Sequence, residues 1–192
     1  MFSLLAGLWR YLTSKTQVNV LILGLDDAGK TTLLEQMKGI FKKVPGIPPA
    51  KIPPTIGLNV AKMDIGGVSV TFWDVGGQVR LRALWERYYA DAHALICVMD
   101  SADAARFEEA QLAFHAVREQ AELHALPLLL LANKQDVAGA CSGGDIAAQF
   151  DAHKVMGVPF RVHAVSALSG EGVNEGISWL IAKAREKTQG MT

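Results

Sequence analysis

The sequence has few cysteines, no excess of charge of either sign and no long apolar run. Cys97 and Cys141 are its only cysteines, and neither stands in a CxxC motif or at metal-binding spacing from histidines, so disulfides and zinc are not expected. Two free thiols are typical of a reducing, cytosolic compartment. Lys plus Arg and Asp plus Glu each number 19. This balance argues against a nucleic-acid partner bound through a basic surface. The longest purely apolar run, residues 94–99, is far below the roughly 20 residues of a membrane span.

The pattern along the 192 residues predicts one α/β domain with an N-terminal appendage. Short apolar runs alternate with segments of helical spacing, which indicates βαβ units and a mostly parallel sheet covered on both faces. Gly66-Gly67 joins two extended segments and predicts a hairpin, hence one antiparallel edge strand. We expect about six strands, at 18–23, 57–65, 68–73, 94–99, 128–132 and 160–165, and helices at 31–41, 104–123, 145–152 and 173–187. Residues 42–54 contain five prolines and are expected to form a loop.

A phosphate-binding motif follows the first predicted strand and opens the first predicted helix. Residues 24–31 read GLDDAGKT and match GxxxxGK[ST] in the context that this motif requires. We expect the loop amides to surround a phosphate, Lys30 to bridge the β- and γ-phosphates, and the Thr31 hydroxyl to bind Mg²⁺. The predicted phosphate-binding residues are Asp27, Ala28, Gly29, Lys30, Thr31 and Thr32. The alternative is a plain glycine-rich strand–helix turn.

A second polar cluster follows the later strands and predicts a guanine pocket. In the run Asn133-Lys134-Gln135-Asp136, the Asp136 carboxylate is expected to accept hydrogen bonds from guanine N1–H and N2–H₂. Adenine lacks this donor pair, so it would leave a charge unpaired. Asn133 and the stem of Lys134 are expected to flank the base. Ser166 and Ala167 would complete the pocket if the Ala167 amide faces guanine O6. The alternatives for these two segments are a polar loop and a turn.

Four further residues are predicted to act near a γ-phosphate. Asp74 ends a strand and is expected to hold Mg²⁺ through water, as a Walker-B acid does. We expect Gly77 to bring its amide close to the γ-phosphate. Gln78 is expected to be catalytic by orienting the attacking water. Thr55, which follows the proline-rich loop, is a candidate second Mg²⁺ ligand. A Gly-Gly turn between a strand and a helix is the alternative.

The first residues carry an amphipathic pattern of their own. Met1, Leu5, Leu8 and Leu12 share one helical face, with Phe2 and Trp9 alongside. We therefore divide the chain into an N-terminal amphipathic helix, 1–14, and a nucleotide-binding domain, 15–192. The helix is expected to exchange between a groove on the domain and a membrane or receptor surface. Permanent packing on the core is the alternative.

Taken in order, these motifs resemble those of the small GTPases, over the whole chain. The segments 24–26, 55–59, 73–78 and 133–136 are similar to the Arf/Arl branch. Phe2, the acidic Asp27 and a longer loop before Thr55 are most like the Arf-related protein subgroup. Phe2 stands where ordinary Arfs carry the glycine that myristoylation requires. Leu58 replaces their usual Phe in an apolar trio with Trp73 and Tyr88 that effectors touch.

The resemblance implies a P-loop GTPase fold and a switch that binds GTP or GDP with Mg²⁺ and hydrolyses GTP slowly without an activating protein. It implies an exchange factor, an activating protein, effectors and an integral membrane receptor, and reversible recruitment from the cytoplasm to Golgi (trans-Golgi) membranes in the regulation of membrane traffic. We expect a monomer. A nucleotide-binding scaffold with negligible hydrolysis and a P-loop small-molecule kinase remain the alternatives.

Overall fold

The computed structural model describes residues 15–190 of the chain. The predicted N-terminal helix, 1–14, lies outside the described residues. Within them, the strands are β1 (Gln17–Leu23), β2 (Leu58–Ile65), β3 (Val68–Val75), β4 (Ala94–Asp100), β5 (Leu128–Asn133) and β6 (Phe160–Ala164). The α-helices are α2 (Lys30–Met37), α3 (Phe107–Arg118), α4 (Gly143–Gln149) and α5 (Val173–Thr188). None of these helices combines the length and apolar character needed to cross a bilayer.

The six strands form one sheet in the order β2-β3-β1-β4-β5-β6, as the alternation of segments predicts. All neighbouring pairs are parallel except β2 and β3, which pair antiparallel. Gly66 and Gly67 join these two strands with φ angles of 56° and 80°, which a two-residue hairpin of this kind requires and glycine adopts at little cost. The sheet therefore has its single antiparallel strand at one edge.

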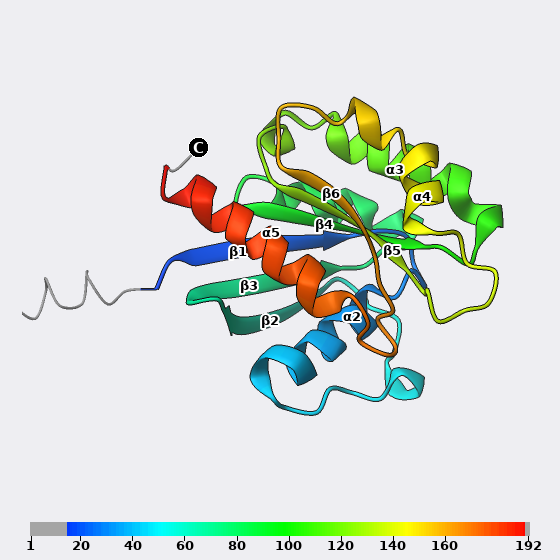
Figure 1. The fold of residues 1–192 in the computed structure, drawn as a ribbon, viewed down its shortest axis with the longest axis horizontal. Helices are drawn as coiled ribbons and strands as arrows, with labels where there is room; N and C mark the ends of the chain where they lie inside the picture. The colour runs from blue at the N-terminus through cyan, green and yellow to red at the C-terminus, as the bar shows by residue number, and fades with distance from the viewer. Residues whose placement is uncertain (1–14, 191–192) are drawn as a thin grey trace, which may run out of the picture.

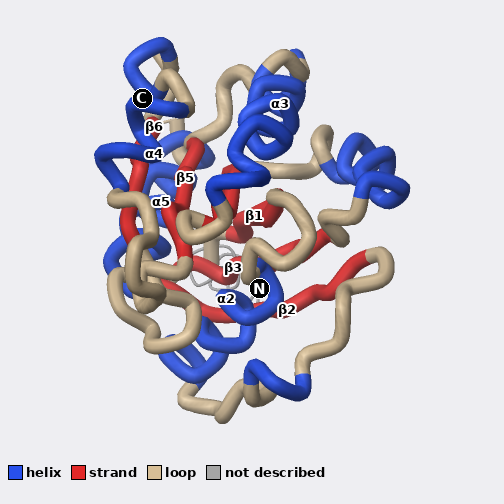
Figure 2. The backbone as a smooth tube through the Cα atoms, turned by 90° about the vertical axis from the view of Figure 1, so that its right-hand side faces the viewer, coloured by secondary structure: helices blue, strands red, loops and turns tan. Residues whose placement is uncertain are grey.

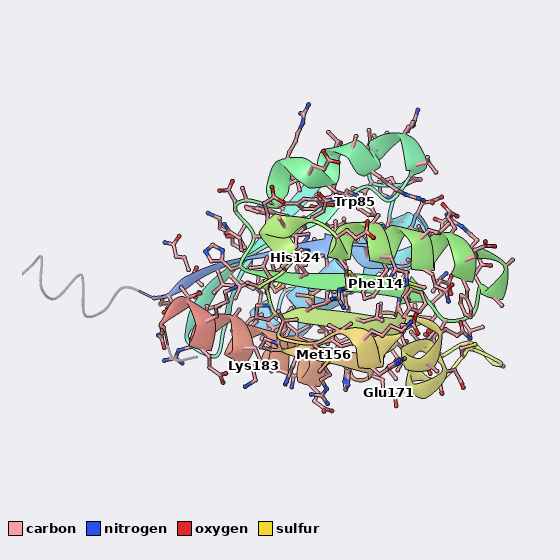
Figure 3. The ribbon with its side chains drawn as sticks, turned by 90° about the horizontal axis from the view of Figure 1, so that it is seen from above. Trp85, Phe114, His124, Met156, Glu171 and Lys183 are labelled. Carbon is pink, nitrogen blue, oxygen red and sulfur yellow. The ribbon has the colours of Figure 1, made fainter. Side chains whose placement is uncertain are left out.

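Helices cover both faces of the sheet, and each face has its own apolar core (Figure 1). Successive residues of β1, such as Val20 and Leu21, belong to the cores on opposite faces of the sheet, and both are fully buried. One core packs α2 and α5 against the sheet. The other packs α3, α4 and the 3₁₀ segment Val79–Tyr88, and it includes Trp85 and Phe114 (Figure 3). Burial on both faces explains why the strands read as apolar runs rather than as alternating ones.

Three predicted helices differ in length from the structure. The segment predicted as one helix, 104–123, contains α3 flanked by short 3₁₀ turns, because Gln120 adopts an extended conformation that ends the helix. The helix predicted over 145–152 begins earlier, at Gly143, where Ser142 and Asp145 form a reciprocal capping box. It ends before Asp151, whose φ of 50° is left-handed. The helix predicted over 31–41 is α-helical only as far as Met37, and residues 38–42 form a π-helical turn.

Figure 2 looks along the strands onto the loops that follow their carboxyl ends. The segments after β1, β3 and β5 all lie at this edge, which is where α/β sheets bind ligands. The candidate site lies there.

Candidate functional site

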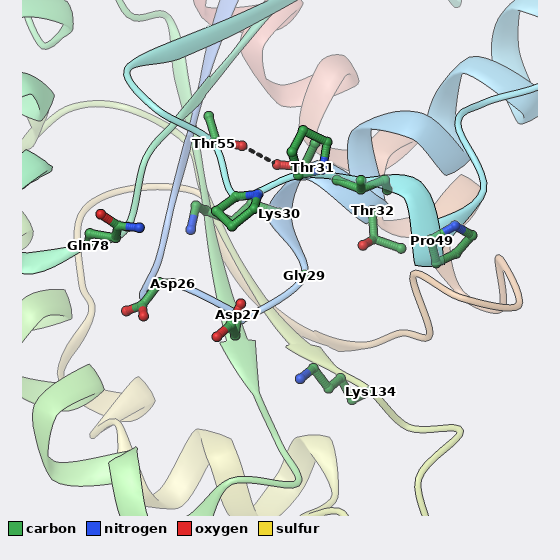
Figure 4. Close-up of a pocket in the computed structure, with 14 residues that line it drawn as sticks. Asp26, Asp27, Gly29, Lys30, Thr31, Thr32, Pro49, Thr55, Gln78 and Lys134 are labelled. Atoms are coloured by element: carbon green, nitrogen blue, oxygen red, sulfur yellow. Dashed lines mark hydrogen bonds between the residues drawn. The ribbon is translucent and has the colours of Figure 1, made fainter.

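A pocket of about 460 Å³ opens at this edge (Figure 4). The lining residues come from four parts of the chain: the loop after β1, the proline-rich loop, the loop after β3 and the loop after β5. They are Asp26, Asp27, Gly29, Lys30, Thr31, Thr32, Pro49, Ile52, Pro53, Pro54, Thr55, Gly77, Gln78 and Lys134. Most of the predicted phosphate-binding residues therefore lie around one cavity.

The loop after β1 has the backbone geometry that its glycines predict. Gly24 passes so close to β4 that a Cβ there would lie 2.3 Å from the Val98 carbonyl oxygen, which excludes any larger residue. Gly29 has a φ of 90° and precedes the first residue of α2. The free amides at the start of α2 consequently face the loop, an arrangement that suits an anion. Ala28 is buried beneath this loop rather than in the pocket wall.

Lys30 is almost completely buried, and its ammonium group is held by the loop itself. Nζ donates to the carbonyl oxygens of Gly24, at 3.0 Å, and Leu25, at 2.6 Å. Burial lowers the pKa of Lys30 to about 8, although the nearby Asp74 carboxylate acts in the opposite direction. A negatively charged ligand in this pocket would stabilise the ammonium form.

The three predicted metal ligands lie together. Thr31 Oγ1 donates to Asp74 Oδ2 at 2.6 Å and lies 2.7 Å from Thr55 Oγ1. Asp74 is fully buried, which raises its pKa, and its Oδ1 has no hydrogen-bond partner among the described residues. Two hydroxyls and an unpaired buried carboxylate oxygen fit a hard divalent cation such as Mg²⁺.

Gly77 and Gln78 reach the same pocket from the end of β3. A Cβ on Gly77 would lie 2.3 to 2.4 Å from backbone atoms of the β1 loop, so only glycine permits this approach. The Gln78 side chain is half-buried, and its Oε1 accepts a hydrogen bond from Arg80 Nε at 3.1 Å. Arg80 thus contacts the side chain that is predicted to be catalytic.

The residues predicted to recognise a base lie beside the phosphate loop, and two of them are hydrogen-bonded to each other. The buried Asn133 side chain donates to the Ala28 carbonyl oxygen at 2.8 Å and accepts from the Ala167 amide at 2.9 Å. The Ala167 amide therefore faces Asn133 in this structure, and its contact with guanine O6 stays a prediction. Asn133 ties the two loops together across the sheet edge.

Lys134 lines the pocket, whereas Asp136 is exposed and is not among the lining residues. Asp136 Oδ1 accepts a hydrogen bond from the buried hydroxyl of Ser166. Lys134 adopts a left-handed φ of 67°, lines the pocket and pairs with Asp100 Oδ2 at 2.6 Å. The Ser166 contact holds one oxygen of the Asp136 carboxylate, and no described residue hydrogen-bonds the other oxygen.

The proline-rich loop contributes pocket residues that sequence analysis did not predict. Pro49, Ile52, Pro53 and Pro54 line the cavity. The loop is fastened to α2 by the buried Glu35, whose Oε2 accepts the Ile47 amide at 3.0 Å. The only sequence signal was the position of the loop between α2 and Thr55.

The fold and site define a P-loop nucleotide-binding domain with a hydroxyl- and carboxylate-lined metal position. Residues 4–184 match the ADP-ribosylation factor (Arf) family. ADP-ribosylation factor-related protein 1 of Bos taurus is 45% identical over 184 residues, covering 94% of this chain and 92% of that protein. ADP-ribosylation factor-like protein 3 of Saccharomyces cerevisiae is 40% identical over 190 residues, covering 95% and 93%.

A solved structure supports the same assignment. The Arl6 BBS3 small GTPase from Trypanosoma brucei, with the bound nucleotide analogue GppNp, matches with a TM-score of 0.78 and 35% identity, covering 89% of this chain and 99% of that chain. The chain belongs to the ADP-ribosylation factor family. It is thus a small GTPase, a switch that binds GTP or GDP with Mg²⁺ and hydrolyses GTP. This class works with exchange factors, activating proteins and effectors.

The family assignment decides between the alternatives left open by the sequence. It favours a hydrolysing switch over a scaffold and over a small-molecule kinase. The pocket agrees, because its described lining contains no arginine, whereas a kinase needs an arginine-rich lid over its phosphates.

Proposed function

We propose that this GTPase regulates Golgi-associated membrane traffic and that Thr55 and Gly77 sense whether the γ-phosphate of GTP is present. The observation that carries the switch mechanism is the convergence of these two residues on the phosphate loop. Thr55 contacts Thr31 from one side, and Gly77 packs on the loop backbone from the other. A γ-phosphate between them would hold both segments, and its loss would release both.

In this proposal the phosphate loop and Lys30 bind the phosphates, and Thr31, Thr55 and, through water, Asp74 hold the metal. When bound, Mg²⁺ would supply positive charge that offsets the negative charge of the phosphates. The amides at the start of α2 and the Lys30 ammonium take up the negative charge that develops during phosphoryl transfer. Gln78 positions the attacking water. An activating protein would supply the arginine that the described lining lacks.

Recognition of guanine is assigned to Asp136, which accepts from the two donors of the base. Ser166 and Asn133 hold that carboxylate and the surrounding loops in place. Lys134 covers the base through its aliphatic stem. These roles are tested by competition of GTP, GDP, ATP and XTP for the purified chain.

An apolar surface beside the hairpin is proposed to bind effectors. Trp73 and Tyr88 pack with ring centroids 5.5 Å apart, and Leu58 on the neighbouring strand is partly exposed. Ile56, in the segment between Thr55 and β2, is 80% exposed. Because Ile56 directly follows Thr55, the γ-phosphate would set the position of this surface.

We assign membrane recruitment to the N-terminal segment 1–14, whose partner in this proposal is an integral membrane receptor. Away from the membrane, the GTPase is proposed to be a monomer in the cytoplasm. The sequence pattern of that segment and the resemblance to the Arf-related subgroup support this part. The test is the distribution of the tagged full chain in cells, compared with Leu5→Glu and Leu8→Glu variants. Golgi staining that is lost in the variants supports the proposal. Diffuse staining of the wild type with GTP bound contradicts it.

A further inference from the structure

A set of charged side chains connects the phosphate loop to the segment that carries Gln78. The side chains are those of Asp26, Arg106, Glu109 and Arg82, and they end at the backbone carbonyl group of Gly77. We call these five residues the charged ring. It begins at Asp26, next to the phosphates' predicted position. Arg106 Nη2 donates to Asp26 Oδ1 at 2.7 Å, and Arg106 Nη1 donates to the Asp26 carbonyl oxygen at 3.1 Å. Arg106 thereby offsets the negative charge that an acidic residue brings to an anion-binding loop.

Glu109, in the first turn of α3, contacts two arginines. Its Oε2 accepts from Arg106 Nε at 3.0 Å, and its Oε1 pairs with Arg82 Nη2. These two guanidinium groups lower the pKa of Glu109, Arg106 more than Arg82, so the carboxylate stays charged. Glu109 consequently links α3 to the segment Val79–Tyr88.

The ring closes at Gly77. Arg82 Nε donates to the Gly77 carbonyl oxygen at 3.0 Å, and Gly77 lies directly against the backbone of Leu25 and Asp26. The preceding carbonyl, that of Gly76, accepts from the buried Trp85 Nε1 at 3.0 Å. Side chains of the segment Val79–Tyr88 therefore hold two successive peptide groups.

This arrangement determines where two amide protons point. In a planar trans peptide the N–H is directed opposite to the C=O. With the Gly76 and Gly77 carbonyls held by Trp85 and Arg82, the N–H groups of Gly77 and Gln78 are directed away from these side chains. Both residues line the nucleotide pocket.

We propose that Arg82 and Arg106 are positioning residues for GTP. They hold the Gly77–Gln78 peptide at the γ-phosphate end of the pocket, and Asp26 fixes the position of Arg106. The proposal rests on the proposed function of Gly77 and Gln78. The ring acts as one unit, because each member orients the next. It favours the GTP-bound form, since GDP offers no γ-phosphate to the oriented peptide.

The test uses the full chain with the substitutions Arg82→Ala, Arg106→Ala and both together. Arg87→Ala is the matched control, because Arg87 is an exposed arginine of the same segment for which the described structure shows no ion pair. Affinities for GTP and GDP are measured by competition, hydrolysis by single turnover at saturating GTP, and folding by thermal unfolding.

Each single substitution is expected to lower the GTP/GDP affinity ratio about fivefold and to slow single-turnover hydrolysis, as the size of typical couplings between sites suggests. The double variant is expected to match the single ones, because the ring opens only once. Arg87→Ala is expected to leave the ratio unchanged. If Arg82→Ala fails to fold, Glu109→Gln takes its place, since it removes the bridging charge at nearly constant size.

A lower unfolding temperature with an unchanged GTP/GDP ratio would overturn the proposal and leave the ring as a brace of the fold. Fully additive effects in the double variant would overturn its action as one unit. A wild type that binds no guanine nucleotide would overturn both this inference and the proposed function, whereas the first two outcomes leave the proposed function intact.

Discussion

The hydroxyl oxygens of Thr31 and Thr55 lie 2.7 Å apart, although 24 residues separate them in the chain. Thr31 is the second residue of α2, whereas Thr55 directly follows the proline-rich loop. The contact therefore joins the first turn of a helix to the segment that leads from the proline-rich loop into β2. Both hydroxyls would be able to hold a bound Mg²⁺, a cation that prefers oxygen ligands.

The substitution Thr31→Asn is expected to weaken GTP binding more than GDP binding. Asn lacks the hydroxyl that contacts Asp74 Oδ2, so a bound Mg²⁺ would lose a protein ligand. The charge of the ion would matter more for the triphosphate than for the diphosphate. We expect the GTP/GDP affinity ratio to fall by about tenfold or more, roughly 1.4 kcal/mol. Competition titration in the presence of Mg²⁺ measures it. Thr31→Ser, which keeps the hydroxyl, is the control, and an equal loss for both nucleotides would contradict the metal assignment.

The substitution Asp136→Asn is expected to change base preference from guanine to xanthine, because the amide offers a donor where the carboxylate accepted. Two hydrogen bonds to a charged acceptor are worth about 3–6 kcal/mol together. The affinity for GTP should therefore fall roughly 10²- to 10⁴-fold. Competition between GTP and XTP measures the change. Equal binding of ATP and GTP by the wild type would show that Asp136 does not face the base.

The substitution Gln78→Leu is expected to leave GTP affinity nearly unchanged and to lower activator-stimulated hydrolysis by about 10²-fold or more, since the attacking water loses its positioning group. Single-turnover hydrolysis with saturating activating protein measures it. Arg80→Ala is the matched control, because it removes the hydrogen bond to the Gln78 carboxamide but keeps the carboxamide. Its rate should be no lower than that of the wild type. Equal rates for Gln78→Leu and the wild type would remove Gln78 from the mechanism.

Nucleotide affinity is expected to fall as the pH rises above 8. Burial lowers the pKa of Lys30 to about 8 in the free protein. Bound phosphates favour the ammonium form and raise this pKa, so the complex holds more protons than the free protein above pH 8. Below that pH both states are protonated and the dependence disappears. Calorimetry in buffers of different ionisation enthalpy should detect proton uptake on GDP binding near pH 8.5. No uptake would contradict the contact between Lys30 and the phosphates.

The substitution Glu35→Ala is expected to accelerate GDP dissociation. Glu35 holds the proline-rich loop by accepting the Ile47 amide, and a hydrogen bond of this kind contributes about 1 kcal/mol. Release of the loop should raise the dissociation rate roughly fivefold. Dissociation of a fluorescent GDP analogue measures it. Glu35→Gln, whose carbonyl oxygen can still accept from Ile47, should remain close to the wild type. If both variants dissociate at the wild-type rate, the loop does not retain the nucleotide.

Most of the fold could be predicted because its signals lie in neighbouring residues. The apolar run of β1 and the GLDDAGKT segment after it reveal a buried strand, a glycine-shaped loop and a helix start, all set by local backbone sterics and burial. The same holds for the Gly66-Gly67 hairpin. The single helix predicted over 104–123 was wrong because apolar periodicity does not reveal the extended Gln120 at which the chain turns back toward β5.

By itself, the amino-acid sequence determined the six-stranded architecture and the motifs whose residues are contiguous: the phosphate loop, the Asn133–Asp136 run and the Asp74–Gln78 run. Only the tertiary structure decided which side chains from separate motifs meet. It directed the Ala167 amide to Asn133 and placed Pro49 and Ile52 in the pocket wall. It also brought Asp26 and Arg106 of the charged ring into contact, although they are 80 residues apart in the chain. The physical reason is that such contacts depend on the rotation of each helix against the sheet and on loop paths, which local propensities leave open.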